Sequence, residues 1–259
     1  MGRRNLSRFF YASPEKLRRA RFSFDPEEER HLVRSLRLGD DAEVRVVDGE
    51  GRGATVRLVR GGKGGWEAEV IDRFDSPVEP ALRVTLAFGL LKAKGTDEVV
   101  ERAAEMGATA LLPFLSARSV PRWDGSKEER NRERLARIAR EGMKVAGGAV
   151  APRIEPIASM AALVEEVRRR GAALLCSLGA EDPLVPRAGP GEALLIVGPE
   201  GGLERGEEEA LIGAGALSVS LGKRNLRAVT AATTALARLL AGPKEGASEG
   251  KRGKNAQNG

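Results

Sequence analysis

Two segments near the C-terminus decide the fold of this chain, ALLIVGPEGGLERGEEEAL at residues 193–211 and SLGKRNLRAVTAATTALARLL at residues 220–240. Each runs from a short apolar strand, through a turn rich in glycine and charge, into a helical pattern. In a parallel α/β sheet, such turns present backbone N–H and C=O groups that no regular element has used. We therefore expect a ligand site in these two turns.

The region before them shows the same pattern, because near-continuous apolar runs alternate with helical segments such as KGTDEVVERAAEMG and MAALVEEVRRRG. The apolar runs are VTLAFGLL, GATALLPFL, AALLCSLG, EALLIVG and LSVSLG. Strands buried on both faces and separated by helices are typical of a parallel sheet. The sequence thus predicts an α/β domain over residues 80–241.

The N-terminal part is different, because short strands with alternating apolar and polar residues occupy residues 1–75. Glycine-rich turns at 49–53 and 61–65 separate these strands, as hairpins require. The pattern predicts a small β-barrel or curled sheet. The two prolines of DSPVEPAL, residues 75–82, place a domain boundary after it.

One helix is expected to interrupt these strands, over residues 25–40. Asp25 can cap it, Pro26 suits its first turn and Gly39 can end it. His31 lies beside Leu32 in this helical stretch, and we interpret it as structural.

Composition limits the functional classes. The chain has 43 Lys and Arg against 37 Asp and Glu, a net charge of +6, which suits a polyanion such as nucleic acid. Aromatic residues make up only 4%, which disfavours base stacking on a sheet face as the main device. No apolar run approaches the roughly 20 residues of a membrane span, and the N-terminus lacks an apolar signal core. Residues 242–259, rich in Gly, Lys and Ser, predict a disordered tail.

Cysteine usage excludes further site types. Cys176 is the single cysteine, so an internal disulfide is impossible, and one Cys with one His cannot build a Cys/His zinc cage. A cytoplasmic location fits this usage best. Because Cys176 lies in an apolar strand, we expect it to be part of the core.

The first turn, GPEGGL, is neither a dinucleotide-binding fingerprint nor a Walker A loop, so phosphate cradling and a dinucleotide-dependent oxidoreductase are disfavoured. Pro199 stiffens this turn, while Gly201 and Gly202 allow close backbone approach and positive φ. Glu200 either braces the loop or contacts a ligand.

The second turn, LGKRNLR, places Arg224 and Arg227 three residues apart, where they can share a face and bind phosphate or a base edge, or form a solvated basic turn. The helix that follows is rich in Ala and Thr. Another backbone is expected to pack close to it, from the same chain or from a partner subunit.

With these turns the chain resembles the SPOUT superfamily of knotted methyltransferases, and specifically the ribosomal RNA small-subunit methyltransferase E family. The resemblance rests on GPEGGL (198–203), LGKRNLR (221–227) and TA (230–231). Further matching segments follow in the family's order: RFF (8–10), HLVRSLRLGD (31–40), VVDGEG (46–51), ERAAEMGA (101–108), LLPFLSARS (111–119) and APRI (151–154).

The resemblance implies an N-terminal PUA-like β-barrel that helps to hold RNA, and a C-terminal α/β domain with a trefoil knot. It implies methylation of N3 of a uridine in 16S ribosomal RNA with S-adenosylmethionine as donor, by a homodimer whose seam includes Thr230–Leu240. No metal is required, because the sulfonium is already an activated leaving group. The implied donor-binding residues are Leu175, Ser177, Leu178, Gly198, Pro199, Glu200, Gly201, Gly202, Leu221, Gly222, Arg224, Leu226 and Thr230.

The reaction also needs cations. Uridine N3 must lose or share its proton during attack, and a nearby positive charge stabilises the developing anion. Arg224 and Arg227 are the candidates for this role, with Arg118 as a third on the RNA side. The target base is expected to leave its stack, and N-terminal arginines are expected to grip phosphate. These are Arg3, Arg4, Arg8, Arg18, Arg19, Arg21, Arg34 and Arg37.

Three departures from the family pattern leave an alternative open. Val229 stands where the family has Glu, Val145 and Gly148 stand near its usual Gln and Arg, and Gly95 aligns with its Lys, although Lys92 and Lys94 lie nearby. The alternative is a SPOUT relative that keeps donor binding but has a different RNA substrate, or a non-catalytic role in RNA binding or ribosome assembly.

Overall fold

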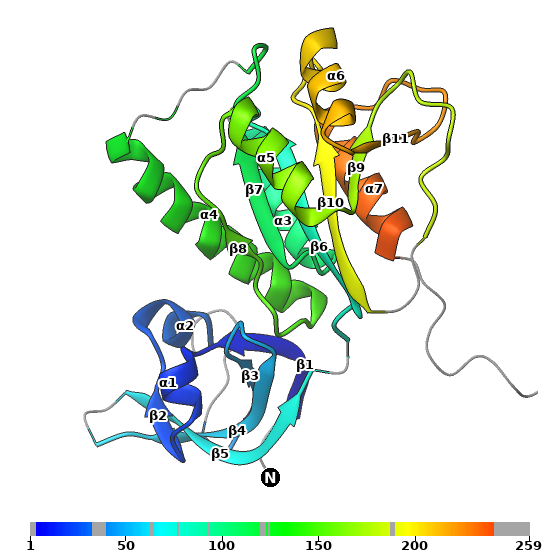
Figure 1. Cartoon of the computed structure of the whole chain (residues 1–259). Helices are drawn as coiled ribbons and strands as arrows, with labels where there is room; N and C mark the ends of the chain where they lie inside the picture. The colour runs from blue at the N-terminus through cyan, green and yellow to red at the C-terminus, as the bar shows by residue number, and fades with distance from the viewer. Residues whose placement is uncertain are drawn as a thin grey trace, which may run out of the picture.

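The computed structural model describes residues 4–32, 40–62, 65–76, 78–92, 94–119, 123, 125–186 and 190–240 (Figure 1). The expected tail at 242–259, the helix end at Gly39 and three of the expected phosphate-binding residues, Arg3, Arg34 and Arg37, lie outside these residues, as does the side chain of Arg4.

The N-terminal part forms a five-stranded sheet in the order β1-β3-β4-β5-β2. β1 runs parallel to β3, and the other neighbours are antiparallel. The strands are β1 Arg4–Tyr11, β2 Arg21–Ser23, β3 Glu43–Val47, β4 Arg52–Arg60 and β5 Trp66–Asp75, with helices α1 Pro14–Leu17 and α2 Pro26–Arg30 between them. Alternate strand residues such as Val44, Val46, Val56 and Leu58 are fully buried in its core, as the alternating pattern predicts.

The hairpin between β4 and β5 is confirmed, since the N–H of Gly61 donates to the carbonyl oxygen of Gly65 at 3.0 Å. The expected helix begins after Asp25 as α2 and continues as a π-helical stretch at His31 and Leu32, and the rest of its expected range, up to Gly39, lies outside the described residues. The expected cap by the Asp25 side chain is wrong: its carboxylate accepts no hydrogen bond from the helix and pairs instead with the Lys16 Nζ at 2.7 Å. The His31 ring packs against the ring of Phe10.

The C-terminal part contains the predicted parallel sheet. Its six strands have the order β11-β9-β10-β6-β7-β8, and every neighbouring pair is parallel. The strands are β6 Leu82–Gly89, β7 Ala110–Phe114, β8 Arg153–Ile154, β9 Ala173–Cys176, β10 Gly191–Val197 and β11 Leu217–Val219. The helices are α3 Lys94–Glu105, α4 Gly125–Ala146, α5 Met160–Arg170, α6 Arg205–Gly213 and α7 Ala228–Leu240.

Helices cover both faces of this sheet, and the central strand β10 shows how its side chains divide. Leu195 and Val197 pack with residues of α3, α4 and α7. Leu194 and Ile196 point to the opposite face and pack with residues of α5 and α6. Because alternate residues of a strand face opposite ways, a strand covered on both sides must be apolar throughout, and this is the pattern in the sequence.

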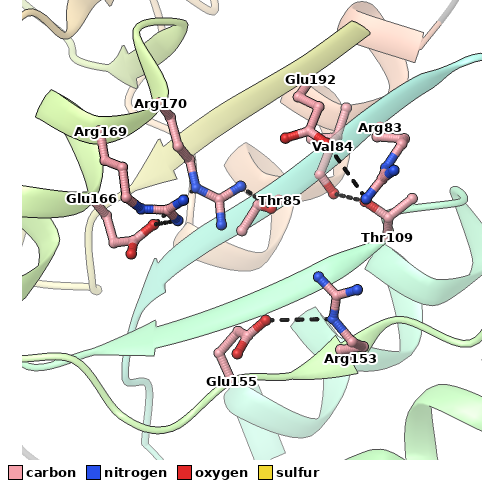
Figure 2. A network of polar contacts seen from close by, with 10 residues as sticks. All are labelled: Arg83, Val84, Thr85, Thr109, Arg153, Glu155, Glu166, Arg169, Arg170 and Glu192. Carbon is pink, nitrogen blue, oxygen red and sulfur yellow. Dashed lines mark hydrogen bonds and ion pairs between the residues drawn. The ribbon is translucent and has the colours of Figure 1, made fainter. Parts of the chain in front are cut away.

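A polar network ties α5 to the sheet near the start of β6 (Figure 2). Arg170, at the end of α5, donates to the Thr85 hydroxyl at 2.7 Å and to the Glu166 carboxylate at 2.9 Å. Arg169 also donates to Glu166, at 2.7 Å, and hydrogen bonds from Arg169 and Arg170 lower the pKa of this carboxyl group. The network lies in the amino-terminal half of β6 and away from the carboxyl ends of the strands.

The two sheets meet at a joint made largely of backbone hydrogen bonds. Gly51 N–H donates to the Ala149 carbonyl oxygen and Ala151 N–H donates to the Gly49 carbonyl oxygen, both at 2.9 Å. The Glu79 carboxylate, between the two sheets in sequence, accepts from the N–H groups of Ala149 at 2.6 Å and Val150 at 3.1 Å. Residues 147–151 are thereby held by both parts of the chain.

A buried ion pair reinforces this joint. The Lys144 ammonium, at the end of α4, contacts the carboxylate of Glu28 in α2, and these residues are 6% and 7% exposed. Lys144 also pairs at 2.7 Å with Glu141, whose side chain is 51% exposed. Lys144 therefore links the two parts of the chain.

Candidate functional site

The candidate site is a cavity of about 430 Å³ at the carboxyl ends of β9, β10 and β11. These three strands are neighbours in the sheet, and the turns that follow them converge because the strands are parallel (Figure 1). Its volume lies within the roughly 300–1,000 Å³ typical of small-molecule sites. The cavity brings together the two turns that the sequence singles out.

The turn after β10 is held in a tight conformation. Gly202 has a φ of 70°, as the glycine pattern predicts, and its N–H donates to the Pro199 carbonyl oxygen at 2.9 Å. Pro199 packs against Gly89, the last residue of β6, so closely that a Cβ at Gly89 would lie 2.5 Å from the proline Cδ. Glu200 braces the loop, since its carboxylate accepts from the Lys92 N–H at 3.2 Å, and it also lines the cavity.

Arg118, from the loop after β7, fastens this turn from the other side. Its guanidinium donates to the Gly201 carbonyl oxygen at 3.0 Å. A Cβ on Gly201 would lie 3.2 Å from the Arg118 Cβ, so close approach rather than positive φ favours glycine here. Glu204 and Glu207 form a capping box at the start of α6, and Glu207 also accepts from the Ala117 N–H at 2.7 Å.

The turns after β9 and β11 lie side by side. The N–H of Ser177 donates to the Val219 carbonyl oxygen at 3.1 Å, and the Ser177 hydroxyl donates to the Glu208 carboxylate at 3.3 Å. A segment before β10 joins them: Leu184 N–H donates to the Ser220 carbonyl oxygen at 3.0 Å, and Ser220 N–H donates to that of Asp182 at 2.7 Å. These hydrogen bonds connect the turns after β9 and β11 with the start of α6 and the segment before β10, and together they form one wall of the cavity.

Most of the expected site residues line this cavity. They are Arg118, Ser177, Leu178, Gly198, Pro199, Glu200, Gly201, Gly202, Leu221, Gly222, Arg224 and Leu226. Leu175, Arg227 and Thr230 are not part of the lining. Leu175 is fully buried among Leu163, Ile196 and Leu211 on the α5 and α6 side of the sheet, and the other two residues are exposed next to the wall.

Further lining residues escaped the sequence analysis: Cys176, Gly179, Val197, Leu203, Glu208, Asn225, Ala228 and Ala231. Leu203, Asn225 and Ala231 lie inside the segments that carry the resemblance, while Gly179, Val197 and Ala228 directly adjoin expected site residues. Glu208 carries a weaker signal, its position one helical turn after Glu204.

Cys176 differs from the expected core residue, because it is half-buried and lines the cavity, although it also packs against the core. Burial raises the pKa of its thiol to about 12. The thiol therefore stays protonated at neutral pH and acts as a weakly polar wall, not as a nucleophile.

The lining suits a ligand with a flat apolar part and a positive charge. Leucine side chains at 178, 203, 221 and 226 provide apolar surface, and glycines expose backbone N–H and C=O groups. The carboxylates of Glu200 and Glu208 can attract a cation, while Arg118 and Arg224 can attract an anion. Within the described ranges, no cluster of three or more His, Cys, Asp or Glu could hold a metal ion.

The residues at which the chain departs from the expected family pattern do not line the cavity. Val229 packs on the core that includes α3 and α7. Val145 is 78% exposed at the end of α4, and Gly148 lies at the joint, with its Cβ position 3.4 Å from the Glu79 carboxylate. At Gly95, a Cβ would contact Leu91 at 3.1 Å.

No described helix is long and apolar enough to cross a membrane.

Comparison with known proteins gives consistent matches. A family model described as RNA methyltransferase domain matches residues 78–240. Ribosomal RNA small subunit methyltransferase E of Mycobacterium bovis is 33% identical over 219 residues, covering 82% of this chain and 83% of the relative. The protein of the same name from Bacillus subtilis is 30% identical, covering 83% and 88%.

A solved structure agrees with these relatives. Ribosomal RNA small subunit methyltransferase E from Neisseria gonorrhoeae, bound to S-adenosyl methionine, is 28% identical and superposes with a TM-score of 0.77. The superposition covers 89% of this chain and 95% of that one.

Proposed function

Because the chain belongs to the ribosomal RNA small subunit methyltransferase E family, we propose that it transfers the methyl group of S-adenosylmethionine to N3 of a uridine in 16S ribosomal RNA. The observation that carries this proposal is the single cavity that unites the turns GPEGGL and LGKRNLR at the ends of three neighbouring parallel strands.

The residues of the cavity fit the donor. Adenine is a flat heterocycle, which the leucine side chains can enclose while the glycine-rich backbone supplies hydrogen-bonding groups. Glu200 and Glu208 provide negative charge for its sulfonium and ammonium groups. When bound, S-adenosylmethionine supplies an activated methyl group that needs no metal.

The chain's own part in the reaction is to position the base and to stabilise charge. Arg224 lines the cavity, and Arg227 follows three residues later in the same non-helical turn, exposed directly before α7. Guanidinium groups held there lower the cost of the negative charge that develops on the uridine ring as N3 loses its proton. Arg118 is fixed to Gly201, which suits it to contact RNA at the rim.

We also propose the domain architecture, the knot, the oligomeric state and the location of the protein. We assign a PUA-like barrel to the five-stranded sheet, with domains at 1–75 and 80–241, and a trefoil knot to the C-terminal part. The pairing of residues 182–184 with Ser220 supports the knot, because it draws the segment before β10 against the end of β11. A homodimer with its seam at α7 and a cytoplasmic location complete the proposal.

The alternative, a relative with altered substrate or no catalytic role, keeps donor binding and therefore predicts the same cavity. It depends on Val229, Val145 and Gly148, none of which lines the cavity. Gly148 lies at the joint between the two sheets, and Val145 is exposed at the end of α4.

The function is tested by mass-spectrometric mapping of uridines in 16S ribosomal RNA from cells with and without this gene. We expect one N3-methyluridine to be lost in the deletion strain and restored by the purified protein with S-adenosylmethionine. An N3-methyluridine pattern that does not change on deletion would rule out the proposed reaction.

Arg227→Ala is expected to lower kcat about 100-fold or more, the usual cost of losing a group that stabilises transition-state charge. The dissociation constant for S-adenosylmethionine, measured by calorimetry, should stay within a few-fold because Arg227 is not part of the cavity lining. Arg83→Ala is the matched control, since Arg83 is exposed and pairs with Glu192 at the other end of the sheet. Unchanged turnover in Arg227→Ala would remove this residue from the mechanism.

A further inference from the structure

A second cavity, of about 370 Å³, lies in the N-terminal part where α1, the turn between β3 and β4, and the end of β5 meet. Its lining residues are Pro14, Leu17, Arg18, Asp48, Arg52, Gly53, Arg73, Phe74 and Asp75, and it shares none with the first cavity. Figure 1 shows α1 and β5 in the lower part of the molecule and β9–β11 in the upper part. The volume falls within the roughly 300–1,000 Å³ of ligand sites.

Arg73 forms a fixed positive part of this cavity. Its guanidinium donates to the carbonyl oxygens of Leu17, Arg18 at 3.2 Å and Arg19 at 3.0 Å, which are the free carbonyls at the end of α1. These oxygens hold the guanidinium in place, and among the described residues Arg73 forms no ion pair, although Asp48 and Asp75 line the same cavity.

Arg18 and Arg52 add two exposed cations. Within the part of the chain that the structure describes, neither side chain has an ion pair or a hydrogen bond. Many other arginines of the protein are paired, for example Arg21 with Glu69 and Arg57 with Asp41. Two unpaired guanidinium groups at one cavity are suited to a phosphate.

The turn that carries Arg52 is held by Asp48. This buried carboxylate accepts from the N–H groups of Glu50 at 2.8 Å and Arg52 at 3.1 Å. The two bonds stabilise its negative charge locally and fix the backbone of Arg52. The position of Arg52 at the cavity is therefore built into the fold.

An aromatic ring and a second carboxylate complete the lining. The Phe74 ring lies over Gly53, where a Cβ would be 2.3 Å from a ring carbon, so only glycine allows the ring this position. The half-buried ring packs against Val47, Met143 and Ala149 and lies near the Arg45 guanidinium, while the rest of it lines the cavity. Asp75, exposed at the next position, can accept hydrogen bonds from base N–H groups.

We propose that this second cavity binds an unpaired nucleotide of the ribosomal RNA substrate, with its phosphate on Arg18 and Arg52 and its base against Phe74. The assignment rests on the proposed function, because it takes the RNA as the ligand. Positive charge alone would attract any anion, whereas an aromatic wall and a carboxylate beside the arginines match a base attached to its phosphate. The protein then holds its substrate at two places, at the reacting uridine and at this nucleotide.

The test compares binding of in vitro transcribed 16S ribosomal RNA by two doubly substituted proteins. Arg18→Ala with Arg52→Ala should weaken binding about 10-fold or more and reduce the slope of log K against log salt by about 1. Arg30→Ala with Arg57→Ala is the control: it removes the same charge from the N-terminal part, at guanidinium groups already bonded to the Pro26 carbonyl oxygen and to Asp41, and this variant should bind nearly as the unaltered protein does. Calorimetry with S-adenosylmethionine should give unchanged affinity for both, which verifies folding.

A third variant tests the base. Phe74→Leu keeps an apolar side chain over Gly53 and should weaken RNA binding by about 10-fold without changing the salt slope, because a lost stacking contact carries no charge. If the two double variants bind RNA equally well, the site is overturned. If only the arginine variant is weakened, the cavity holds a phosphate without its base, and the nucleotide assignment is wrong. Failure of the unaltered protein to methylate RNA would overturn the proposed function and would be seen separately from these binding data.

Discussion

Replacing Gly89 with alanine is expected to weaken S-adenosylmethionine binding about 100-fold or more, although Gly89 does not line the cavity. The added Cβ would lie 2.5 Å from Pro199 Cδ and 2.6 Å from Pro199 N, so a rigid ring and the backbone would have to move. The turn cannot shift freely, because Glu200 is bonded to the Lys92 N–H and Gly201 to Arg118. The clash must therefore deform the wall of the donor site.

Calorimetry gives the affinity, and thermal unfolding gives the accompanying loss of stability, which should be about 1–3 kcal/mol as for other overpacked sites. Gly206→Ala is the matched control. Its Cβ in α6 would meet nothing within 4 Å, and alanine favours a helix by about 1 kcal/mol over glycine, so stability should rise slightly with unchanged affinity. If Gly89→Ala binds S-adenosylmethionine as tightly as the control does, the clash with Pro199 does not reach the donor site.

Replacing Lys144 with methionine is expected to destabilise the protein by about 3–5 kcal/mol at neutral pH, the usual cost of leaving one partner of a buried ion pair alone. Glu28 would keep its carboxylate in the joint, where its Oε2 already has no hydrogen-bond partner among the described residues. The Glu141 carboxylate would not become an unpaired buried charge, because its side chain is half exposed to water.

The pH dependence of this loss has a definite sign. Burial raises the pKa of Glu28 above its ordinary value of 4.5, and the charge and hydrogen bond of Lys144 oppose that rise, so removing Lys144 raises it further. A carboxyl group with a raised folded-state pKa contributes stability that is fully present below its unfolded pKa and is lost as pH rises through the folded value. The variant should therefore be closest to the unaltered protein in acid, and furthest from it at neutral pH.

Urea unfolding at about pH 5 and about pH 8 measures this difference. Two further variants separate the causes. Glu141→Gln should cost under about 1 kcal/mol, as expected for an exposed pair. Glu28→Leu combined with Lys144→Met should recover most of the stability, because an apolar pair leaves no buried charge. A pH-independent loss, or no recovery in the double variant, would mean that the ion pair is not what holds the joint.

Two strands at the sheet edges, β8 and β1, have weak signals in the sequence. β8 is two residues long and pairs only with Ala110 and Leu111 of β7. β1, RNLSRFFY, lacks regular alternation and ends in three consecutive aromatic residues. An edge strand covered on one side is under little constraint on its outer face, so its periodicity is weak.

Within the site, strand alternation explains a one-residue error. Leu175 was expected to line the cavity, but it points into the core beneath α5 and α6, and its neighbour Cys176 lines the wall instead. Successive residues of a strand face opposite sides, and an apolar run buried on both faces does not reveal which side holds the ligand.

The sequence by itself determined the parallel sheet, the two turns that form the cavity and their helices, because burial on both faces and turn chemistry leave local patterns. Only the tertiary structure decided that Gly89 supports Pro199 and that Lys144 meets Glu28, 116 residues away. It also placed Gly148 at the joint, beside Glu79, and left Val145 exposed at the end of α4. The physical reason is that such contacts depend on the order of strands and the packing of the two sheets, which no local periodicity encodes.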